Sequence, residues 1–233
     1  MSVTASPALA GSLLLDGVPA EGRQAVLERA VFRRLDRKQV LFREGEPAAA
    51  LYVVESGRLK LTQLTADGQE VLVRFVGPGE TCAGVAVLEG STYPVTAQAA
   101  EPTRLALWPR DVLREMCERH PQIQTNILRA ITGHLQESMT RARELATERV
   151  APRVARTLLR LAQQAGREVE GGVLVGHPLS RQELAEMAGT TLFTVSRLLS
   201  QREADGVVEA GRERVLIRSP RRLAELAAEP ESS

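Results

Sequence analysis

The sequence lacks any long apolar run. Among its 233 residues, no stretch approaches the roughly 18 consecutive apolar residues that a membrane-spanning helix requires. The leucine run at residues 13–15 is short, and no basic region precedes it, which argues against a secretory signal peptide. We therefore expect a cytoplasmic protein without a membrane partner.

Cysteine and histidine are scarce. The two cysteines, Cys82 and Cys117, have no spacing that suggests a disulfide framework, and we expect buried free thiols. The three histidines, His120, His134 and His177, are scattered, so no cluster predicts a zinc or iron–sulfur site. A Ser/His/Asp order and a phosphate-binding glycine loop are also missing. The sequence thus predicts no enzyme, no metal site and no cofactor.

An excess of charge of one sign is missing as well, because the net charge is only +1. Residues 149–222 are nevertheless basic, with thirteen Arg, no Lys and eight acidic residues. Arg149, Arg153, Arg156 and Arg160 recur at three- and four-residue spacing, which suits a surface that contacts phosphates. The alternative is composition alone, since 28 of the 30 basic residues in the whole chain are Arg.

Short apolar runs dominate the first half of the chain. They cover residues 40–42, 51–54, 59–61, 71–75 and 105–108 and alternate with turn signals. Gly45, Gly57, Gly68 and Gly79 recur at regular intervals, and Asp67-Gly68 is typical of a tight hairpin. This pattern predicts a closed β-barrel, roll or sandwich, preceded by a short helix at about residues 22–31.

Helical patterns follow at residues 109–119 and, from a well-placed proline, at residues 121–146. Along the longer helix, apolar residues recur at steps of three and four: Ile123, Ile127, Leu128, Ile131, Leu135, Ala142 and Leu145. This stripe resembles a coiled-coil seam, and we predict a homodimer interface made by Ile123, Ile127, Ile131, Leu135 and Ala142. The alternative is packing of the stripe on the chain's own β-domain, and one helix can do both.

A second domain begins near residue 146. A helix is expected at residues 147–165 and a short strand at 173–175. We therefore divide the chain into a β-roll sensor domain at 1–120, a dimerisation helix at 121–146, and a DNA-binding domain at 147–233.

Residues 180–201 have the pattern of a helix-turn-helix. Ser180 and Glu183 form a capping box that starts the first helix. Ala185 is small where two helices must approach, and Gly189 can adopt an unusual turn conformation. Leu184, Ala188, Val195 and Leu198 supply apolar anchors on both helices. Two further strands at residues 206–208 and 212–217 would complete a winged helix, with Arg212 and Arg214 as candidate phosphate contacts.

The second helix would lie in the major groove with its N-terminal half toward the bases. The predicted DNA-binding residues are Arg181, Gln182, Thr191, Phe193, Thr194, Ser196 and Arg197. Arg197 suits a bidentate contact with guanine, Ser196 can donate or accept, and Thr194 suits a phosphate. Phe193 either contacts a thymine methyl group or is buried against a neighbouring helix.

This layout resembles the cyclic-AMP receptor/fumarate-nitrate regulator (CRP/FNR) family over about residues 35–218. The resemblance rests on the glycine-spaced β-segment, the long helix and the motif RQELAEMAGTTLFTVSRLL. It implies an α+β fold: an N-terminal double-stranded β-helix, or jelly roll, like a cyclic-nucleotide-binding domain, then a long dimerisation helix and a winged helix-turn-helix. It also implies a homodimeric transcription regulator that binds double-stranded DNA at a palindromic operator and contacts RNA polymerase.

Branches of the resembled family differ in the effector that they bind, and each uses characteristic residues. Cyclic-AMP-binding members have a Gly-Glu and an Arg-Ser pair where this chain has Ala83-Gly84 and Pro94-Val95, so we expect no control by cyclic AMP. The cysteine cluster of the iron–sulfur branch is absent, as is the β-roll histidine of the carbon-monoxide sensor. Residues 91–99 resemble the nitric-oxide branch, which has heme-dependent members.

The effector and its site residues stay unknown. The open alternatives are heme bound by His120 or His134, a redox sensor that uses Cys82 or Cys117, and a regulator without an effector. The alternative function is a ligand- or redox-sensing β-roll module whose main role is not gene control. Residues 194–197 resemble the nitrate-regulator branch, which reads a TTGA-like half-site but has glutamate where Phe193 stands.

Overall fold

The computed structural model describes residues 6–68, 70–176 and 179–228. The chain forms two compact units, one up to Gln136 and the other from Glu137. The division falls inside helix α5 (Pro121–Thr147), whereas the boundaries drawn from the sequence lie on either side of that helix.

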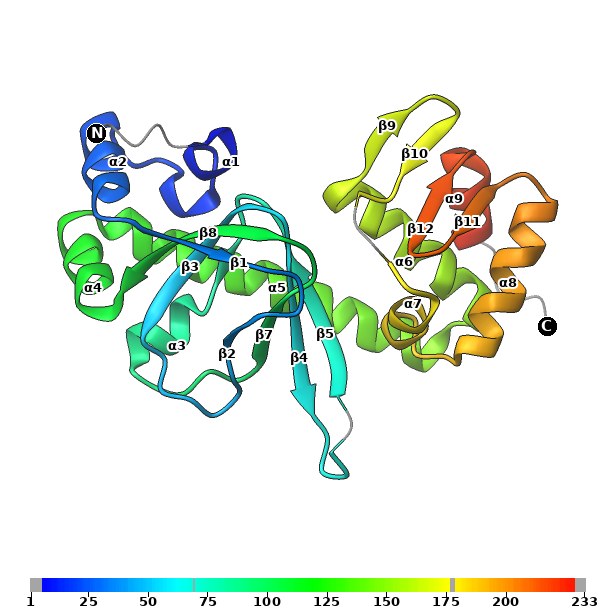
Figure 1. Cartoon of the computed structure of the whole chain (residues 1–233), viewed down its shortest axis with the longest axis horizontal. Helices are drawn as coiled ribbons and strands as arrows, with labels where there is room; N and C mark the ends of the chain where they lie inside the picture. Colours follow the sequence, from blue (N-terminus) through cyan, green and yellow to red (C-terminus); the bar gives the residue numbers. More distant parts are fainter. Residues whose placement is uncertain (1–5, 69, 177–178, 229–233) are drawn as a thin grey trace. The chain divides into compact units, whose positions relative to one another are not determined.

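The first unit is built on two four-stranded antiparallel sheets (Figure 1). One sheet has the order β1 (Val31–Leu35), β8 (Thr103–Pro109), β3 (Ala50–Ser56) and β6 (Thr81–Cys82). The other has the order β2 (Val40–Phe42), β7 (Thr96–Ala99), β4 (Leu59–Leu64) and β5 (Glu70–Val76). Apart from the β4–β5 hairpin, neighbouring strands come from distant parts of the sequence, and the expected roll of β-strands is confirmed.

Glycines set the turns of this roll. Gly45, Gly57, Gly68 and Gly79 all have φ between +79° and +83°, a conformation that residues with a Cβ adopt only with strain. Gly57 is also closely packed, since a Cβ there would lie 2.3 Å from the carbonyl oxygen of Pro102. The periodic glycines therefore mark real turns, although Gln69, at the end of the predicted hairpin turn, lies outside the described residues.

Short helices surround the roll. They are α1 (Pro7–Ala10), the 3-10 turn η1 (Leu13–Leu15), α2 (Ala20–Glu28), α3 (Gly84–Glu89) and α4 (Arg110–Arg119). Leu14 and Leu15 are buried in the core, so the early leucine run is a packing element. The indole Nε1 of Trp108 donates a hydrogen bond of 2.8 Å to the carbonyl of Val26, which ties β8 to α2.

Helix α5 begins by packing on the roll. Ile123 and Ile127 are 0% and 2% exposed and belong to the core of the first unit. Their assignment to a dimer interface is therefore corrected, because side chains buried within the protomer present no surface to a second copy. The stripe changes character after Ile127, since Leu128, Ile131 and Leu135 are exposed.

The second unit is a winged helix. After the end of α5 it contains α6 (Val150–Ala165), β9 (Arg167–Val169), β10 (Gly172–Leu174), α7 (Arg181–Met187), α8 (Leu192–Ala204), β11 (Val208–Gly211), β12 (Arg214–Ile217) and α9 (Pro220–Ala228). The sheet order is β11-β12-β10-β9, all antiparallel (Figure 1). The sequence analysis missed β9 and α9. In the part of the chain that is described, no helix combines the length and apolarity needed to cross a membrane.

Candidate nucleic-acid interface

Helices α7 and α8 begin at the residues that the sequence indicates. The Ser180 Oγ accepts a hydrogen bond of 3.1 Å from the backbone N–H of Glu183, and the Glu183 carboxylate accepts one of 2.9 Å from the N–H of Ser180. The Thr191 hydroxyl caps α8 by accepting a hydrogen bond of 3.2 Å from the N–H of Thr194. Both caps satisfy backbone donors that a helix start leaves unpaired.

Gly189 makes the turn between the two helices. Its φ is +59°, and a Cβ at this position would lie 2.1 Å from Cδ2 of Leu145. The left-handed conformation favours glycine, as the motif indicated, and any Cβ here would displace the Leu145 side chain. Leu145, near the end of α5, therefore packs directly over the turn of the helix-turn-helix.

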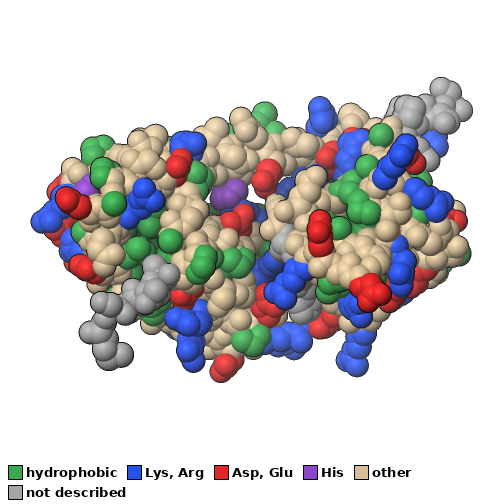
Figure 2. Space-filling model, turned by 90° about the horizontal axis from the view of Figure 1, so that it is seen from above, with side chains coloured by type: hydrophobic (Ala, Val, Ile, Leu, Met, Phe, Trp, Pro, Cys, Tyr) green, Lys and Arg blue, Asp and Glu red, His purple; other side chains and the backbone are tan. Residues whose placement is uncertain are grey.

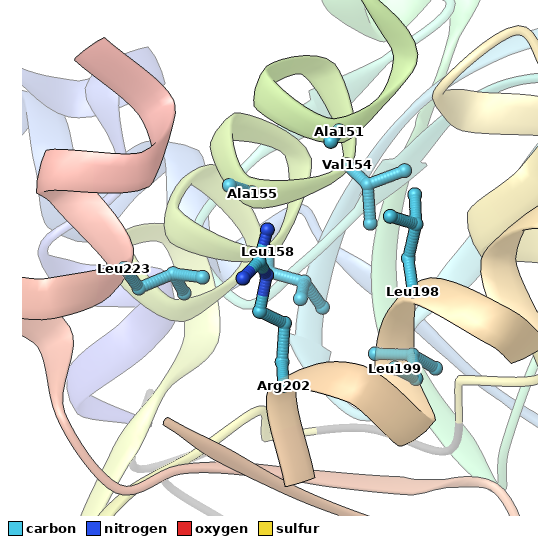
Figure 3. A pocket seen from close by; sticks show the side chains of 8 residues that line it. All are labelled: Ala151, Val154, Ala155, Leu158, Leu198, Leu199, Arg202 and Leu223. Atoms are coloured by element: carbon cyan, nitrogen blue, oxygen red, sulfur yellow. The ribbon is translucent and has the colours of Figure 1, made fainter. Parts of the chain in front are cut away.

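The inner face of the motif is fully packed. Ala185 is 0% exposed where α7 approaches α8, and the anchors Leu184, Ala188, Val195 and Leu198 are all buried, which confirms their predicted role. Figure 3 shows a narrow apolar pocket where Leu198 and Leu199 of α8 approach α6 and α9. Its lining residues are Ala151, Val154, Ala155, Leu158, Leu198, Leu199, Arg202 and Leu223. This apolar packing fixes the position of α8 within the second unit.

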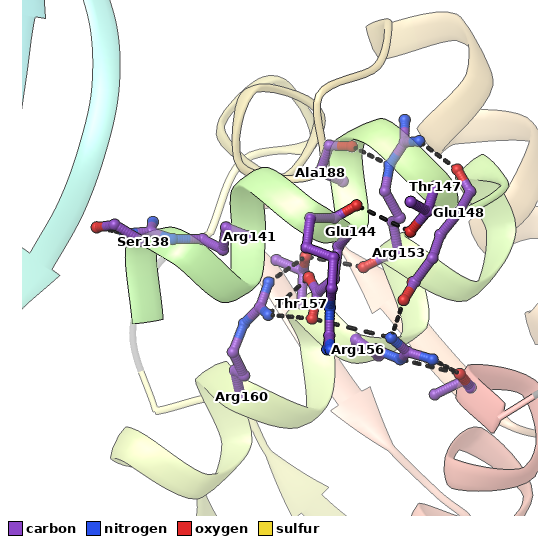
Figure 4. Close-up of polar contacts among 12 residues, drawn as sticks. Ser138, Arg141, Glu144, Thr147, Glu148, Arg153, Arg156, Thr157, Arg160 and Ala188 are labelled. Carbon is purple, nitrogen blue, oxygen red and sulfur yellow. Dashed lines mark hydrogen bonds and ion pairs between the residues drawn. The ribbon is translucent and has the colours of Figure 1, made fainter. Parts of the chain in front are cut away.

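Arg153 on α6 supports the helix-turn-helix through hydrogen bonds to its backbone. Arg153 is 9% exposed and donates hydrogen bonds to the carbonyl oxygens of Ala188 (3.0 Å) and Glu148 (2.6 Å) (Figure 4). It also donates one of 3.1 Å to the carbonyl oxygen of Gly189. The side chain therefore connects α6 to the end of α7 and to the turn before α8.

Two further arginines on α6 are engaged within the same unit. Arg156 donates to the carbonyl of Ala227 at 3.0 and 2.7 Å and pairs with the Glu148 carboxylate. Arg160 binds both oxygens of the buried Glu144 carboxylate at 3.0 and 2.8 Å (Figure 4). The expectation that Arg153, Arg156 and Arg160 form a phosphate-contacting surface is therefore wrong, because their guanidinium groups bond carbonyls and carboxylates of the protein itself.

The outer face of α8 and its N-cap carry five of the seven predicted DNA-binding residues. Thr191, Phe193 and Arg197 are exposed, and Thr194 and Ser196 are half-buried. Phe193 is 78% exposed, which rules out its burial against a neighbouring helix. Thr194 is already engaged, because its Oγ1 lies 3.0 Å from Oγ1 of Thr191.

The two other predicted residues begin α7. Arg181 is half-buried and Gln182 is exposed, with the Gln182 amide donating to the Glu186 carboxylate at 3.0 Å. In the wing, Arg212 and Arg214 are exposed at the β11–β12 turn. Acidic and basic side chains are interspersed over the face shown in Figure 2, in line with the net charge of +1.

The β-roll interior is closely packed around Gly84, at the start of α3. A Cβ at Gly84 would lie 2.8 Å from Cγ2 of Ile127 and 3.1 Å from Cδ1 of Leu51. The preceding residue, Ala83, has a left-handed φ of +71° and starts α3. A larger side chain at position 84 thus has no space in this arrangement.

Three aromatic residues gather inside the roll. The rings of Phe42 and Tyr93 stack with centroids 3.8 Å apart, and those of Phe42 and Tyr52 with centroids 5.6 Å apart. The Tyr93 hydroxyl lies 3.4 Å from that of Tyr52, and burial raises the pKa of Tyr52, with the Tyr93 hydroxyl as a second cause. This cluster was not predicted from the sequence, because its members come from β2, β3 and the loop before β7.

The cysteines are buried and free, as expected. Burial raises the pKa of the Cys82 thiol to about 12 and also raises that of Cys117. A thiol with a raised pKa carries little of the thiolate that redox chemistry requires.

The histidines give little support to a heme site. The ring of His120 packs on α2, since a Cβ at Gly22 would lie 2.7 Å from its Cε1. His134 is half-buried on α5, and His177 lies outside the described residues. Where the chain is described, no three or more His, Cys, Asp or Glu side chains are grouped to hold a metal ion.

Models of known protein families match both units of the chain. A model of the cyclic nucleotide-binding domain matches residues 32–120, and a model of the Crp-like helix-turn-helix domain matches residues 152–226. The cyclic AMP receptor protein of Thermus thermophilus is 30% identical over 217 residues, which cover 93% of this chain and 97% of that protein. The chain belongs to the CRP/FNR family.

Other relatives of this CRP/FNR protein support its membership of the family. A CRP-like cAMP-activated global transcriptional regulator of Mycobacterium tuberculosis is 28% identical over 94% of this chain and 98% of its own length. The structure of FixK2 from Bradyrhizobium japonicum matches with a TM-score of 0.75 and 26% identity, covering 87% of this chain and 99% of that one. The chain is thus a CRP/FNR-type transcription regulator with a helix-turn-helix DNA-binding domain, and these relatives are regulators, not enzymes.

Replacing Arg153 tests its role in holding the turn. Arg153→Ala removes three charge-assisted hydrogen bonds and leaves the carbonyl of the buried Ala188 without this partner, so we expect it to lower the free energy of unfolding by about 2–4 kcal/mol. Arg221→Ala is the control, since Arg221 is 91% exposed and its loss should change stability by no more than about 0.5 kcal/mol. Urea denaturation measures both. Equal effects of the two changes would contradict the assigned role.

Thiol reactivity tests the burial of Cys82. Its pKa of about 12 leaves so little thiolate that iodoacetamide at pH 8 should modify it at least about 100-fold more slowly in the folded protein than in guanidinium chloride, as measured by peptide mass spectrometry. Because the folded-state pKa exceeds the ordinary value of 9.0, the associated stability is present below pH 9 and lost between pH 9 and about 12. Similar rates in both states would show an accessible thiol and favour the redox hypothesis.

Proposed function

We propose that the protein is a homodimer that recognises a palindromic DNA operator, with Ser196 and Arg197 of α8 reading bases. The outward face of α8 carries this proposal. Its inner face is anchored by Val195 and Leu198, so the neighbouring Ser196 and Arg197 point away from the core. Arg197 suits the two acceptors of guanine, and Ser196 can donate or accept. Half-sites about 34–36 Å apart would match two copies of the motif.

Phosphate contacts would position α8 in the major groove. The beginning of α7, with Arg181 and Gln182, and the capped start of α8, with Thr191 and Thr194, supply candidate donors. Arg212 and Arg214 extend the same function to the wing. Such contacts fix the register of the protein on DNA, whereas the bases determine the sequence.

The dimer interface would lie along the exposed part of α5. Leu128, Ile131, Leu135 and Met139 are 54%, 38%, 58% and 64% exposed, and Ala142 continues the series at a three-residue step. Large apolar side chains at steps of three and four on a long helix favour burial against a second helix. Ile131, Leu135 and Ala142 thus stay in the proposed interface, joined by Leu128 and Met139.

Control by cyclic AMP is not part of the proposal. Gly84 stands where cyclic-AMP-binding members have glutamate, and the contacts of its neighbours Ile127 and Leu51 leave no room for a longer side chain. Val95 and Pro94 replace the Arg-Ser pair, so a bound cyclic phosphate would lack its arginine partner. The proposed binding to DNA supports a location in the cytoplasm, and family membership supports contact with RNA polymerase.

Arg197→Ala tests base reading. After an operator has been selected from random duplex DNA with the full chain, this change should weaken binding to it by about 1–3 kcal/mol and relax discrimination at one base pair per half-site. Arg221→Ala, which removes the same charge from α9, should keep the preference. Fluorescence anisotropy measures both, and added cyclic AMP should leave the affinities unchanged. An equal loss on unrelated DNA would contradict the base-reading role.

Leu135→Glu tests the dimer. A carboxylate at this exposed position would be forced into the apolar interface twice per dimer, so we expect the dimer dissociation constant to rise about 100-fold or more. Gln136→Glu adds the same charge to the adjacent exposed position and should leave the dimer intact. Sedimentation equilibrium measures both constants. A folded Leu135→Glu protein that remains fully dimeric would place the interface elsewhere.

A further inference from the structure

The first turn of α8 exposes two apolar side chains. Leu192 is 48% exposed and Phe193 is 78% exposed, the largest exposed fraction of any large hydrophobic residue in the described part of the chain. A phenyl ring in this position contributes little to folding, because it buries almost no surface. Its placement on the proposed recognition helix therefore favours a contact with a molecule other than this chain.

Phe193 lies on the same face of α8 as the proposed base readers. Ser196 and Arg197 follow it by three and four residues, the spacing at which side chains are neighbours on a helix. Phe193 is also closer to the N-terminus of α8, the half of a recognition helix that contacts base edges. The three side chains thus form one continuous surface.

The surrounding groups favour an apolar contact with DNA. The first turn of α8 contains no acidic residue, so nothing in it repels the DNA backbone. The hydroxyls of Thr191 and Thr194 face each other at 3.0 Å. A phenyl ring has no donor or acceptor for phosphates or base edges, and the apolar group that the major groove presents is the C5-methyl group of thymine.

We infer that Phe193 is a specificity-determining residue that contacts the C5-methyl group of one thymine in each operator half-site. The inference rests on the proposed function, because it needs α8 in the major groove. Leu192, the neighbouring exposed side chain, would widen the apolar contact. The chemistry recognised is a 5-methylpyrimidine, and the hydrogen bonds of the base are read by other residues.

Replacing thymine with deoxyuridine tests the inference, because this change removes the methyl group and keeps every hydrogen-bonding group. In the selected operator, each thymine is replaced in turn, in both half-sites at once, and the affinity of the full chain is measured by fluorescence anisotropy. At one position per half-site we expect the affinity to fall about three- to fivefold for each methyl group removed, as loss of one buried methyl predicts.

Phe193→Ala should bind the thymine and deoxyuridine operators with equal affinity, because the side chain that contacts the methyl group is gone. Leu64→Ala is the matched control. Leu64 is a 61% exposed apolar residue on β4 in the other unit, and its loss should keep the preference for thymine. Circular dichroism verifies that each variant is folded.

The outcomes separate this inference from the proposed function. Sequence-specific binding with no sensitive thymine, or a thymine preference that persists in Phe193→Ala, would overturn the role of Phe193 and leave the proposed function standing. Failure to enrich any DNA sequence would overturn both. A thymine preference that is lost in Phe193→Ala and kept in Leu64→Ala would establish the contact.

Discussion

The DNA-binding unit depends on how helix α6 engages the ends of its neighbours. Arg153 donates to the carbonyls of Ala188 and Gly189 just beyond α7, and Arg156 donates to the carbonyl of Ala227 near the end of α9. Carbonyls at helix C-termini lack partners within the helix and form the negative end of the helix dipole. A buried guanidinium satisfies these acceptors while its own donors are satisfied in turn. The position of α8 follows from this arrangement, because the turn that precedes it is held in place.

The two units differ in how far the sequence predicts them. The helix-turn-helix was predicted almost completely, because its caps, its glycine turn and its spacing are local signals. The roles of Arg153 and Ile127 could not be predicted in this way. Helical spacing shows which residues share a face of a helix, but it does not show which residues that face contacts. Arg153 meets carbonyls 35 and 36 residues away, and Ile127 meets Gly84 at the start of a helix that was not predicted. The Phe42–Tyr52–Tyr93 cluster was missed for the same reason, because long-range strand pairing brings its members together.

The β-roll matches the model of the cyclic nucleotide-binding domain. Glycine turns and strand order reproduce a cyclic-nucleotide-binding domain, yet Gly84 is packed against Ile127 and Leu51. Fold and ligand chemistry are separate properties, since a fold is fixed by turns and core residues while a ligand is recognised by a few polar groups. In this chain Ile127 links the first part of α5 to Gly84 at the start of α3.

The use of arginine has a consequence for covalent regulation. From Glu137 to the end, the sequence contains no lysine, and the two lysines of the chain, Lys38 and Lys60, belong to the β-roll. Acetylation of side-chain amines, which removes charge from many DNA-binding proteins, therefore has no target in the unit that carries α8. Guanidinium groups also keep their charge throughout the physiological pH range. The positive charge that arginines give to this unit is therefore insensitive to lysine acetylation and to acidification within the physiological pH range.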